Sequence, residues 1–379
     1  MEEVAQGMIA EQRAPLLAIV STDIRRDLVA PMRHFTRFRI RHFYRKAPYG
    51  DLSPADLDDT LVRYRGPWDL FRLLWQARPD IVQGVEPYAL AQLPFQAAIC
   101  LYVWLRRVPL VAGAHISRPL PPKYGKAVAA LLWLVLQPFL RSVRLFFYLN
   151  EGARRNLRWL GVPEQKLVRH MYGTWGIDPD EFTPVPDGRE PDWGPGPVLL
   201  YVGRLHAEKG IDDLLEAYSL VREEVPDARL VLIGDGPERP AIERWIKARG
   251  WQDAVLLLGP VKNRDLPPCL RAATVLVSPS RTTRKWEEYV GMTNLQAMAS
   301  GLPVVATRNG AIPEYLPETA GVLVPERDPQ ALAAAIVRLL RDPETCRRMG
   351  EAGRAYAATH YDARRNVQEA ERRLLALLA

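Results

Sequence analysis

Residues 201–218, YVGRLHAEKGIDDLLEAY, are the most informative part of the sequence about its fold. The stretch begins as an apolar β-rich run that ends at Gly203, continues as a loop that holds Arg204 and Lys209, and becomes a helical pattern from Gly210. A strand that leads through a short loop into a helix is one unit of a parallel sheet covered by helices. Two cations in such a loop are able to converge on a diphosphate, and fixed cations stabilise the charge that grows on a leaving diphosphate. Taken alone, the pair is also consistent with two solvated surface cations.

The same alternation of short β-rich runs and longer helical patterns extends to both sides of this stretch. It predicts parallel sheets with helices on both faces, which is the doubly wound α/β class. Before the stretch, the expected strands lie at 16–22, 79–84, 108–114 and 144–150. The second series consists of 197–203, 228–234, 254–259, 273–278, 302–306 and 321–325.

The two series are separated by TPVPDGREPDWGPGP, residues 183–197, where Pro and Gly are crowded as in an interdomain linker. The sequence therefore predicts a first domain over 1–186, a second over 187–360, and a last helix over 361–379 that crosses back onto the first domain. Two Rossmann-like domains of this kind are expected to face a central cleft at the carboxyl ends of their strands, where ligands bind.

The composition indicates an ordered, positively charged protein. Just under half of the 379 residues are hydrophobic, which is enough for two cores, and the formal net charge is +7. Such a charge favours phosphates, anionic lipid or nucleic acid as partners, although a solvated surface of Arg mixed with Asp and Glu explains it equally well. No recognisable nucleic-acid-binding module is present.

The cysteines and the apolar runs point to the cytoplasm. Cys100, Cys269 and Cys346 lie far apart, which suggests neither a disulfide framework nor a zinc site and is consistent with a reducing compartment. The acidic N-terminus does not resemble a signal peptide. The longest apolar runs, 89–105 and 127–140, are short for membrane spans, and we expect them to be buried helices.

A second motif is WEEYVGMTNLQAMASGLPVVATRNGAIPEYL, residues 286–316. Glu288 precedes Gly291, and a helix is expected to begin near Met292 or Thr293 and to end at Gly301. The free N–H groups and the dipole at a helix N-terminus favour phosphate, so residues 291–294 (Gly291, Met292, Thr293, Asn294) are candidate donor ligands. Glu288 is placed to bond sugar hydroxyls and Gln296 to reach a ribose. The alternative is an ordinary capped helix with Glu288 facing solvent.

Together these motifs resemble the donor domain of family-4 glycosyltransferases, which are retaining enzymes of the GT-B fold. The family's G-R-L-x-x-x-K-G run is matched by Gly203, Arg204, Leu205, Lys209 and Gly210. Its E-x-F-G-x-x-x-x-E-A-M-A-x-G-x-P-V-V run is matched at Glu288, Gly291, Ala297, Met298, Gly301, Pro303, Val304 and Val305. Family-like runs are also visible at 150–163, 172–184 and 233–238.

The resemblance implies sugar transfer from a UDP-, GDP- or ADP-sugar with retention at the anomeric carbon. Arg204 and Lys209 would neutralise the diphosphate, so neither a metal nor a cofactor is expected. The proposal usual for such enzymes is attack from the leaving-group face with the diphosphate as base. His115, which follows the strand at 108–114, resembles a family His at the donor sugar, although a lone His there is often structural. His206 is expected to be a surface residue.

Two departures from the family pattern leave alternatives open. Gln296 stands where the family has a Glu for the ribose; it retains an acceptor and a donor but carries no charge. STDIRRDLVAP, residues 21–31, replaces the usual Gly-Gly loop, so Arg25 or Arg26 either line the acceptor side or only cover the surface. A catalytically weak nucleotide-sugar-binding protein is therefore the rival hypothesis. A phosphorylase of the same fold lacks a recognisable lysine-cofactor motif.

The basic, aromatic stretch 25–46 is either a solvated face or a peripheral contact with an anionic membrane. Its exposed candidates are Arg33, Arg37, Arg39 and Arg41. The expected location is thus the cytoplasm, with possible attachment to the inner face of the cell membrane. Neither the base, the sugar nor the acceptor is identified by these motifs.

Overall fold

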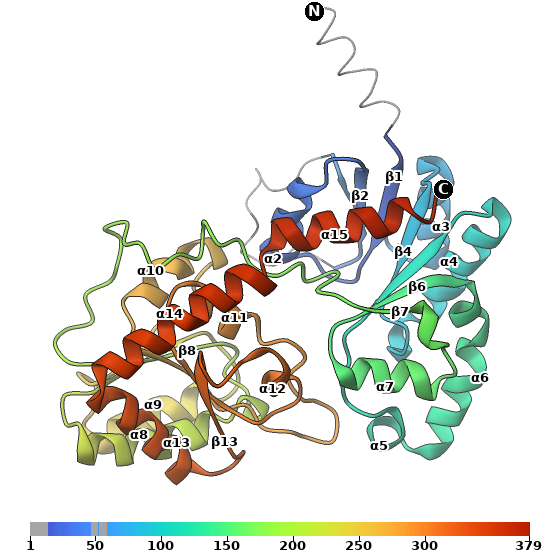
Figure 1. Cartoon of the computed structure of the whole chain (residues 1–379). Helices are drawn as coiled ribbons and strands as arrows, with labels where there is room; N and C mark the ends of the chain where they lie inside the picture. The colour runs from blue at the N-terminus through green and yellow to red at the C-terminus, as the bar shows by residue number, and fades with distance from the viewer. Residues whose placement is uncertain (1–13, 47–51, 53–58) are drawn as a thin grey trace, which may run out of the picture. The chain divides into compact units, whose positions relative to one another are not determined.

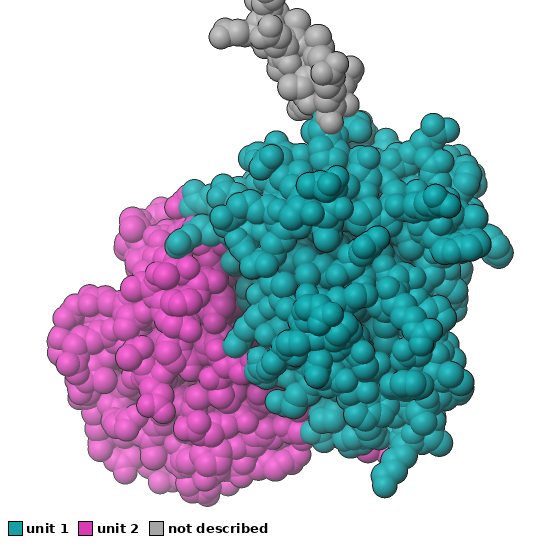
Figure 2. All heavy atoms as spheres, turned by 45° about the vertical axis from the view of Figure 1, so that its right-hand side comes forward, with its two compact units in different colours: residues 1–175, 363–379 teal, residues 176–362 magenta. Residues whose placement is uncertain are grey.

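The computed structural model describes residues 14–46, 52 and 59–379, so the acidic N-terminal residues discussed above lie outside it. The chain divides into two compact units, residues 1–175 with 363–379 and residues 176–362 (Figure 2). The division after Trp175 comes earlier than the boundary expected after residue 186. The reason is local: the Ile177 N–H donates to the Tyr361 carbonyl at 2.8 Å and Arg354 Nη1 donates to the Phe182 carbonyl at 2.7 Å, which ties residues 177–182 to the second unit.

Unit 1 is built on a seven-stranded parallel sheet in the order β3-β2-β1-β4-β5-β6-β7 (Figure 1). Its strands are β1 Leu16–Val20, β2 Arg39–Tyr44, β3 Leu61–Arg63, β4 Ile81–Gly84, β5 Leu110–Ala114, β6 Val143–Tyr148 and β7 Leu167–Arg169. Its main helices before residue 175 are α2 Arg26–Val29, η1 Ala30–His34, α3 Pro67–Ala77, α4 Leu93–Arg106, α5 Leu120–Tyr124, α6 Lys126–Ser142 and α7 Glu151–Trp159.

Side chains that alternate along the strands form two cores, one on each face of this sheet. Ala18, Val82 and Ala112 contribute to the core shared with α3, α4 and α6. Leu17, Ile81 and Val111 contribute to the opposite core, which is closed by the C-terminal helix α15, Ala363–Leu375.

Helix α15 returns the chain from the second unit to the first. Val367, Ala370 and Leu374 recur at helical spacing and are fully buried against the sheet face that carries Leu17 and Ile81. Glu371, only 3% exposed, accepts hydrogen bonds from the backbone N–H groups of Thr36 at 2.9 Å and Arg37 at 2.6 Å. The expected last helix therefore begins at Ala363 and packs on unit 1.

Unit 2 is built on a six-stranded parallel sheet in the order β10-β9-β8-β11-β12-β13. The strands are β8 Val198–Val202, β9 Arg229–Ile233, β10 Val255–Leu257, β11 Val275–Ser278, β12 Val304–Thr307 and β13 Gly321–Val324. The main helices are α8 Ile211–Glu224, α9 Arg239–Arg249, α10 Leu266–Arg271, α11 Met292–Ala299, α12 Ile312–Tyr315, α13 Pro329–Arg341 and α14 Pro343–His360. The prediction of two doubly wound parallel-sheet domains is confirmed.

One expectation about the apolar runs is wrong. Helices α4 and α6 form where the runs 89–105 and 127–140 predict helices, but both expose their outer faces. Leu131 and Leu134 of α6 are 60% and 63% exposed, because only the side of the helix toward the sheet has anything to pack against. In the described part of the chain, no helix combines the length and apolar character that crossing a bilayer requires.

Candidate donor-binding site

The loop between β8 and α8 is held rigidly by its backbone. Gly210 has a φ of 68°, and a Cβ there would collide with the Pro279 carbonyl oxygen, so only glycine is accommodated. Leu205 forms two backbone hydrogen bonds with the loop between β9 and α9. Its N–H donates to the Asp235 carbonyl at 2.9 Å, and its carbonyl accepts from the Glu238 N–H at 3.1 Å. The positions from which Arg204 and Lys209 project are therefore fixed.

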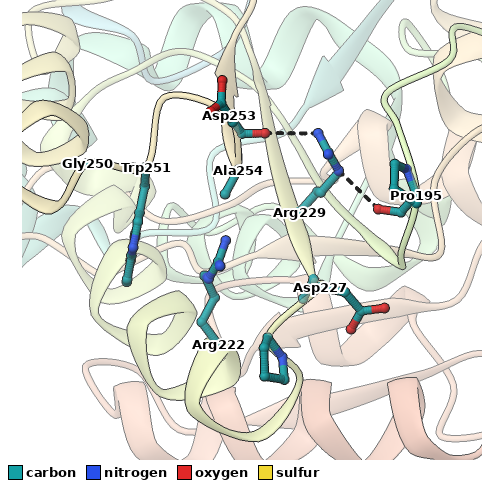
Figure 3. Close-up of a pocket in the computed structure, with 10 residues that line it drawn as sticks. Pro195, Arg222, Asp227, Arg229, Gly250, Trp251, Asp253 and Ala254 are labelled. Atoms are coloured by element: carbon teal, nitrogen blue, oxygen red, sulfur yellow. Dashed lines mark hydrogen bonds between the residues drawn. The ribbon is translucent and has the colours of Figure 1, made fainter.

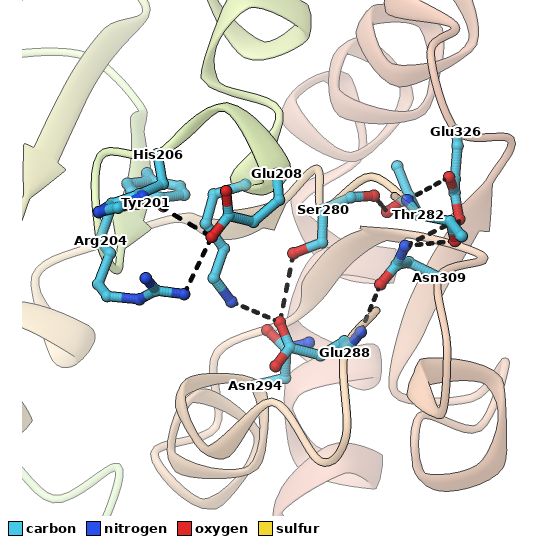
Figure 4. Close-up of polar contacts among 12 residues, drawn as sticks. Tyr201, Arg204, His206, Glu208, Ser280, Thr282, Glu288, Asn294, Asn309 and Glu326 are labelled. Atoms are coloured by element: carbon cyan, nitrogen blue, oxygen red, sulfur yellow. Dashed lines mark hydrogen bonds and ion pairs between the residues drawn. The ribbon is translucent and has the colours of Figure 1, made fainter. Parts of the chain in front are cut away.

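Lys209 meets Glu288 directly, although they are 79 positions apart in sequence (Figure 4). Lys209 Nζ lies 2.6 Å from Glu288 Oε2 and 4.5 Å from the centre of the Trp286 ring. Ser280 Oγ donates a further hydrogen bond of 3.3 Å to the same carboxylate oxygen. Both charged side chains are mostly buried, with 18% and 13% exposed, so this pair is weakly screened by solvent.

Asn309 positions Glu288 through its backbone. Its Oδ1 accepts from the Glu288 N–H at 2.8 Å, while its Nδ2 donates to Thr282 Oγ1 at 2.9 Å and to Glu326 Oε1 at 2.8 Å (Figure 4). The Asn309 side chain is fully buried. It therefore joins the Glu288 loop to the loop after β11 and to the end of β13, which orients the carboxylate toward Lys209.

Arg204 lies in the same loop as Lys209 but is more open. Its Nη2 forms an ion pair with Glu208 Oε1 at 3.2 Å, and 55% of the side chain is exposed. His206 Nδ1 lies 3.7 Å from the same carboxylate oxygen and 36% of that side chain is exposed. A ligand phosphate can thus reach Arg204 if it displaces Glu208 from the guanidinium.

The N-terminus of α11 begins at a glycine, as the sequence predicts. Gly291 has a φ of 56°, and a Cβ there would collide with the Tyr315 hydroxyl. The next two residues, Met292 and Thr293, are half-buried and occupy the first helical positions, whose N–H groups have no acceptor within the helix. These N–H groups are available to an anion.

Asn294 and Gln296 face the interior of unit 2. Asn294 is 1% exposed and donates from Nδ2 to the Tyr315 hydroxyl at 3.0 Å, so its side chain has a partner inside the unit. The cause is its place on the core side of the first helical turn. Gln296 is 3% exposed, which leaves little of its side chain for a ribose to contact.

His115 belongs to unit 1 and has its own partners at the end of β5. Glu86 Oε2 accepts from the His115 backbone N–H at 3.0 Å and lies 2.9 Å from Nδ1, while Nε2 lies 3.1 Å from the Tyr172 carbonyl oxygen. Burial alone would lower the pKa of His115, but the hydrogen bond to Glu86, its charge and the Tyr172 carbonyl together raise it. Glu86 Oε1 is buried and has no hydrogen-bond partner among the described residues.

The remaining cations named from the sequence have local partners or face solvent. Arg25 forms an ion pair with Asp27 at 3.1 Å at the start of α2. Exposed side chains of the basic stretch are Arg33, Arg37, Arg39 and Arg41.

A pocket in unit 2 is unrelated to these motifs (Figure 3). Arg222, Arg229 and Trp251 contribute to its walls, at the end of the sheet where β9 and β10 begin. The Arg229 guanidinium is already engaged by the carbonyl oxygens of Pro195 at 3.0 Å and Asp253 at 2.9 Å. Because parallel strands place ligands at their carboxyl ends, this pocket is not the donor site.

Sequence reasoning missed the residues that position the pair. Ser280, Asn309 and Glu326 come from three different loops, and only Asn309, in the quoted TRNGA segment, lay inside a recognised motif. Glu86 was missed as the partner of His115 because the two are 29 positions apart. In the described residues, no three His, Cys, Asp or Glu side chains gather where a metal ion could be held.

Two parallel-sheet units, with a cationic loop after the first strand of the second unit and a carboxylate beside it, define the class of GT-B glycosyltransferases. Two family models match the chain. The model for "glycosyl transferases group 1" matches residues 190–356, and the model for a "glycosyl transferase 4-like domain" matches residues 9–173. The chain belongs to this glycosyltransferase family.

Known relatives agree with that assignment. Alpha-D-kanosaminyltransferase of Streptomyces kanamyceticus is 35% identical over 346 residues, 85% of this chain and 86% of that protein. A GDP-mannose-dependent phosphatidylinositol monomannoside mannosyltransferase of Mycolicibacterium smegmatis is 34% identical over 194 residues, 49% of this chain and 51% of the relative. The fold matches the Anabaena protein HepE in complex with UDP and glucose, with a TM-score of 0.74 and 16% identity over 96% of this chain and 100% of that one.

Proposed function

We propose that the protein is a retaining glycosyltransferase that transfers a sugar from a nucleoside-diphosphate sugar without a metal or another cofactor. The observation that carries the proposal is the contact between Lys209 and Glu288 at 2.6 Å, close in sequence to the α11 N-terminus that begins after Gly291. It joins a cation suited to a diphosphate with a carboxylate suited to sugar hydroxyls. The relatives support a nucleotide-sugar donor, and their donors differ, which leaves the base open.

In the proposed reaction, the diphosphate replaces Glu288 as the ion-pair partner of Lys209. The Glu288 carboxylate then accepts hydrogen bonds from the hydroxyls of the transferred sugar. As the bond between the anomeric carbon and the phosphate oxygen breaks, negative charge grows on the diphosphate. Lys209, Arg204 and the N–H groups of Met292 and Thr293 stabilise that charge, and because the loop is fixed they need little reorganisation. The acceptor hydroxyl attacks from the same face, its proton passes to the leaving diphosphate, and configuration is retained.

We assign the acceptor to unit 1. Support comes from the carboxyl edge of its sheet, where His115 and Glu86 lie and where the described residues leave Gln83 Oε1, Glu86 Oε1 and Gln92 Oε1 buried without partners. Buried polar atoms are normally satisfied, so a polar ligand with several donors suits this edge. We further propose the cytoplasm as the working compartment, since Cys100, Cys269 and Cys346 are all free thiols.

The rival function is a catalytically weak binding protein that retains the nucleotide site. The observation that favours it is Gln296, which is uncharged and 3% exposed where the resembled family has Glu. Such a protein would bind nucleotide without transferring or releasing sugar.

Thermal unfolding with UDP, GDP and ADP, each in the presence of EDTA, tests the proposal. A diphosphate at a hundred times its dissociation constant is expected to stabilise the protein by about 2.7 kcal/mol. Stabilisation that appears only with magnesium or manganese would contradict metal independence. With the matching sugar donor, release of the diphosphate and an unchanged anomeric configuration in the product separate an enzyme from a binder.

A further inference from the structure

Unit 1 exposes a broad apolar face on the outer side of α3, α4 and α6. Trp68 of α3 is 72% exposed and Trp104 of α4 is 74% exposed. On α6, Leu131 and Leu134 are 60% and 63% exposed. Single exposed apolar residues are ordinary, but a cluster that covers three helices marks a surface that contacts a membrane or another molecule.

Helix α6 shows why this face is unusual. Residues 127–136, AVAALLWLVL, contain no polar or charged side chain. Its inner side packs into the core through Ala129, Leu132 and Leu136, while Val128, Leu131 and Leu134 point outward and are exposed. A helix that is apolar on all sides is normally buried on all sides. No described part of the chain covers the outer side of α6.

The three helices form one continuous surface. Trp75 of α3 lies 6.4 Å from Tyr102 of α4 between ring centres, and the Arg106 guanidinium of α4 lies 5.4 Å from the centre of the Trp75 ring. Helix α4 packs in turn against α6. Figure 1 shows α3, α4 and α6 on the same side of the sheet, and Figure 2 turns that side of unit 1 toward the viewer.

The net positive charge of the chain is concentrated in the segment that contains these three helices. Residues 65–144 contain ten Lys or Arg and three Asp or Glu, a net charge of +7, which equals the formal net charge of all 379 residues. The rest of the chain is therefore neutral overall. Arg72 lies between Trp68 and Trp75 on the exposed side of α3, and Lys126 opens α6.

We propose that the outer face of α3, α4 and α6 is the docking surface for an anionic lipid bilayer. Trp and Leu would enter the headgroup boundary, and Arg and Lys would meet the phosphates, an arrangement typical of interfacial proteins. Each cation near an anionic surface adds to the attraction. A second copy of this chain is disfavoured as the occupant, because an isologous contact would bring two faces of the same charge together.

This surface replaces the one expected from residues 25–46. Within that stretch, η1 packs against α15, and Phe35 and Phe38 belong to the core closed by α15. The face formed by α3, α4 and α6 covers the opposite core. One flat bilayer cannot contact both sides of the sheet, so Arg33 and Arg37 are not part of the docking surface.

Vesicle flotation with the full chain tests the proposal. Wild-type protein is expected to float with vesicles of phosphatidylglycerol and phosphatidylcholine, to bind vesicles of phosphatidylcholine alone more weakly, and to dissociate from the mixed vesicles as salt screens the charges. The triple variant Trp104→Glu, Leu131→Glu, Leu134→Glu is expected to partition into the mixed vesicles at least about tenfold more weakly, which corresponds to about 1.4 kcal/mol. The reason is that three apolar contacts are lost and three negative charges face the anionic lipid. The substituted side chains are exposed, so circular dichroism and Tm should be unchanged.

A matched control adds the same charge elsewhere. Val185→Glu, Gln252→Glu and Gln330→Glu introduce three carboxylates at exposed positions of unit 2, and this variant should bind like the wild type. Replacement of Arg33 and Arg37 by Ala should also leave binding unchanged. The proposal is overturned if wild-type protein stays unbound, if both triple variants bind equally, or if light scattering shows a dimer that only the first variant dissociates.

Discussion

At the scale of single residues, the central feature is a cation and a carboxylate that neutralise each other. Lys209 and Glu288 lie on different loops, and Ser280 and Asn309 hold Glu288 in place by a side-chain and a backbone contact, respectively. A diphosphate that binds Lys209 has to compete with Glu288. Under the proposed function, the pair therefore couples arrival of the nucleotide to release of the carboxylate for the sugar.

Lys209→Ala and Glu288→Gln should separate these two roles. Loss of a hydrogen bond to a charged group costs about 1.5–3 kcal/mol, so Lys209→Ala is expected to weaken nucleoside-diphosphate binding roughly 10- to 100-fold. Loss of one preorganised charge contact should also slow turnover by about 10²–10³. Glu288→Gln should bind the bare diphosphate as well as wild type or better, because the competing charge is gone, while turnover with the full donor collapses.

Calorimetry with the diphosphate and steady-state rates with the full donor give the four values to compare. Lys247→Ala, which removes an exposed lysine from α9, is the matched control and should match wild type in both. If Glu288→Gln loses diphosphate affinity as severely as Lys209→Ala, then Glu288 contacts the nucleotide and is not the sugar ligand.

At the scale of elements, glycines set how closely the loops of unit 2 approach each other. The backbone at Gly210 packs on Pro279, and that at Gly291 packs on Tyr315. Both residues have positive φ and both sit where a helix begins. Each brings a helix N-terminus to the carboxyl edge of the sheet, which is where parallel-sheet domains bind ligands.

Gly291→Ala should damage both folding and binding. The left-handed backbone costs a non-glycine residue about 1–2 kcal/mol, and the new Cβ would in addition collide with the Tyr315 hydroxyl. We expect the Tm of unit 2 to fall by more than the cost of the left-handed backbone alone explains. We also expect the affinity for the diphosphate to drop, because the N–H groups of α11 move. Gly250→Ala is the matched control: Gly250 has a φ of 65° but nothing within 4 Å of a Cβ. Equal losses in the two variants would show that the Tyr315 contact is unimportant.

At the scale of the whole molecule, the chain leaves unit 1 after Trp175 and returns to it at Ala363. The stability of unit 1 thus depends on the last residues of the sequence. Buried apolar side chains of α15 and the buried carboxylate of Glu371 cover the sheet face that carries Leu17 and Ile81. The opposite face carries α3, α4 and α6, whose outer sides remain apolar and exposed.

Leu374→Ala should therefore destabilise unit 1 and spare unit 2. Leu374 is fully buried, and replacement of a buried Leu by Ala typically costs about 2–5 kcal/mol. Two compact units can unfold in separate thermal transitions. The transition whose midpoint temperature is unchanged by the nucleoside diphosphate is assigned to unit 1. Calorimetry should show that transition moving to lower temperature. Arg372→Ala, which removes a 71% exposed side chain from the same helix, should leave it in place. A drop confined to the nucleotide-sensitive transition would contradict the assignment of α15 to unit 1.

Sequence patterns were sufficient to predict the two parallel-sheet domains, the loop that carries Arg204 and Lys209, and the glycine at the start of α11. These features depend on periodicity and on local backbone geometry, which neighbouring residues dictate. Three features followed from the tertiary structure alone: the pairing of Lys209 with Glu288, the hydrogen bond from Asn294 to Tyr315, and the end of unit 1 at Trp175. The tertiary structure also showed that the apolar run of α6 is half exposed. The partner and the burial of a side chain are set by segments distant in sequence, and no local pattern records which of them will pack against it.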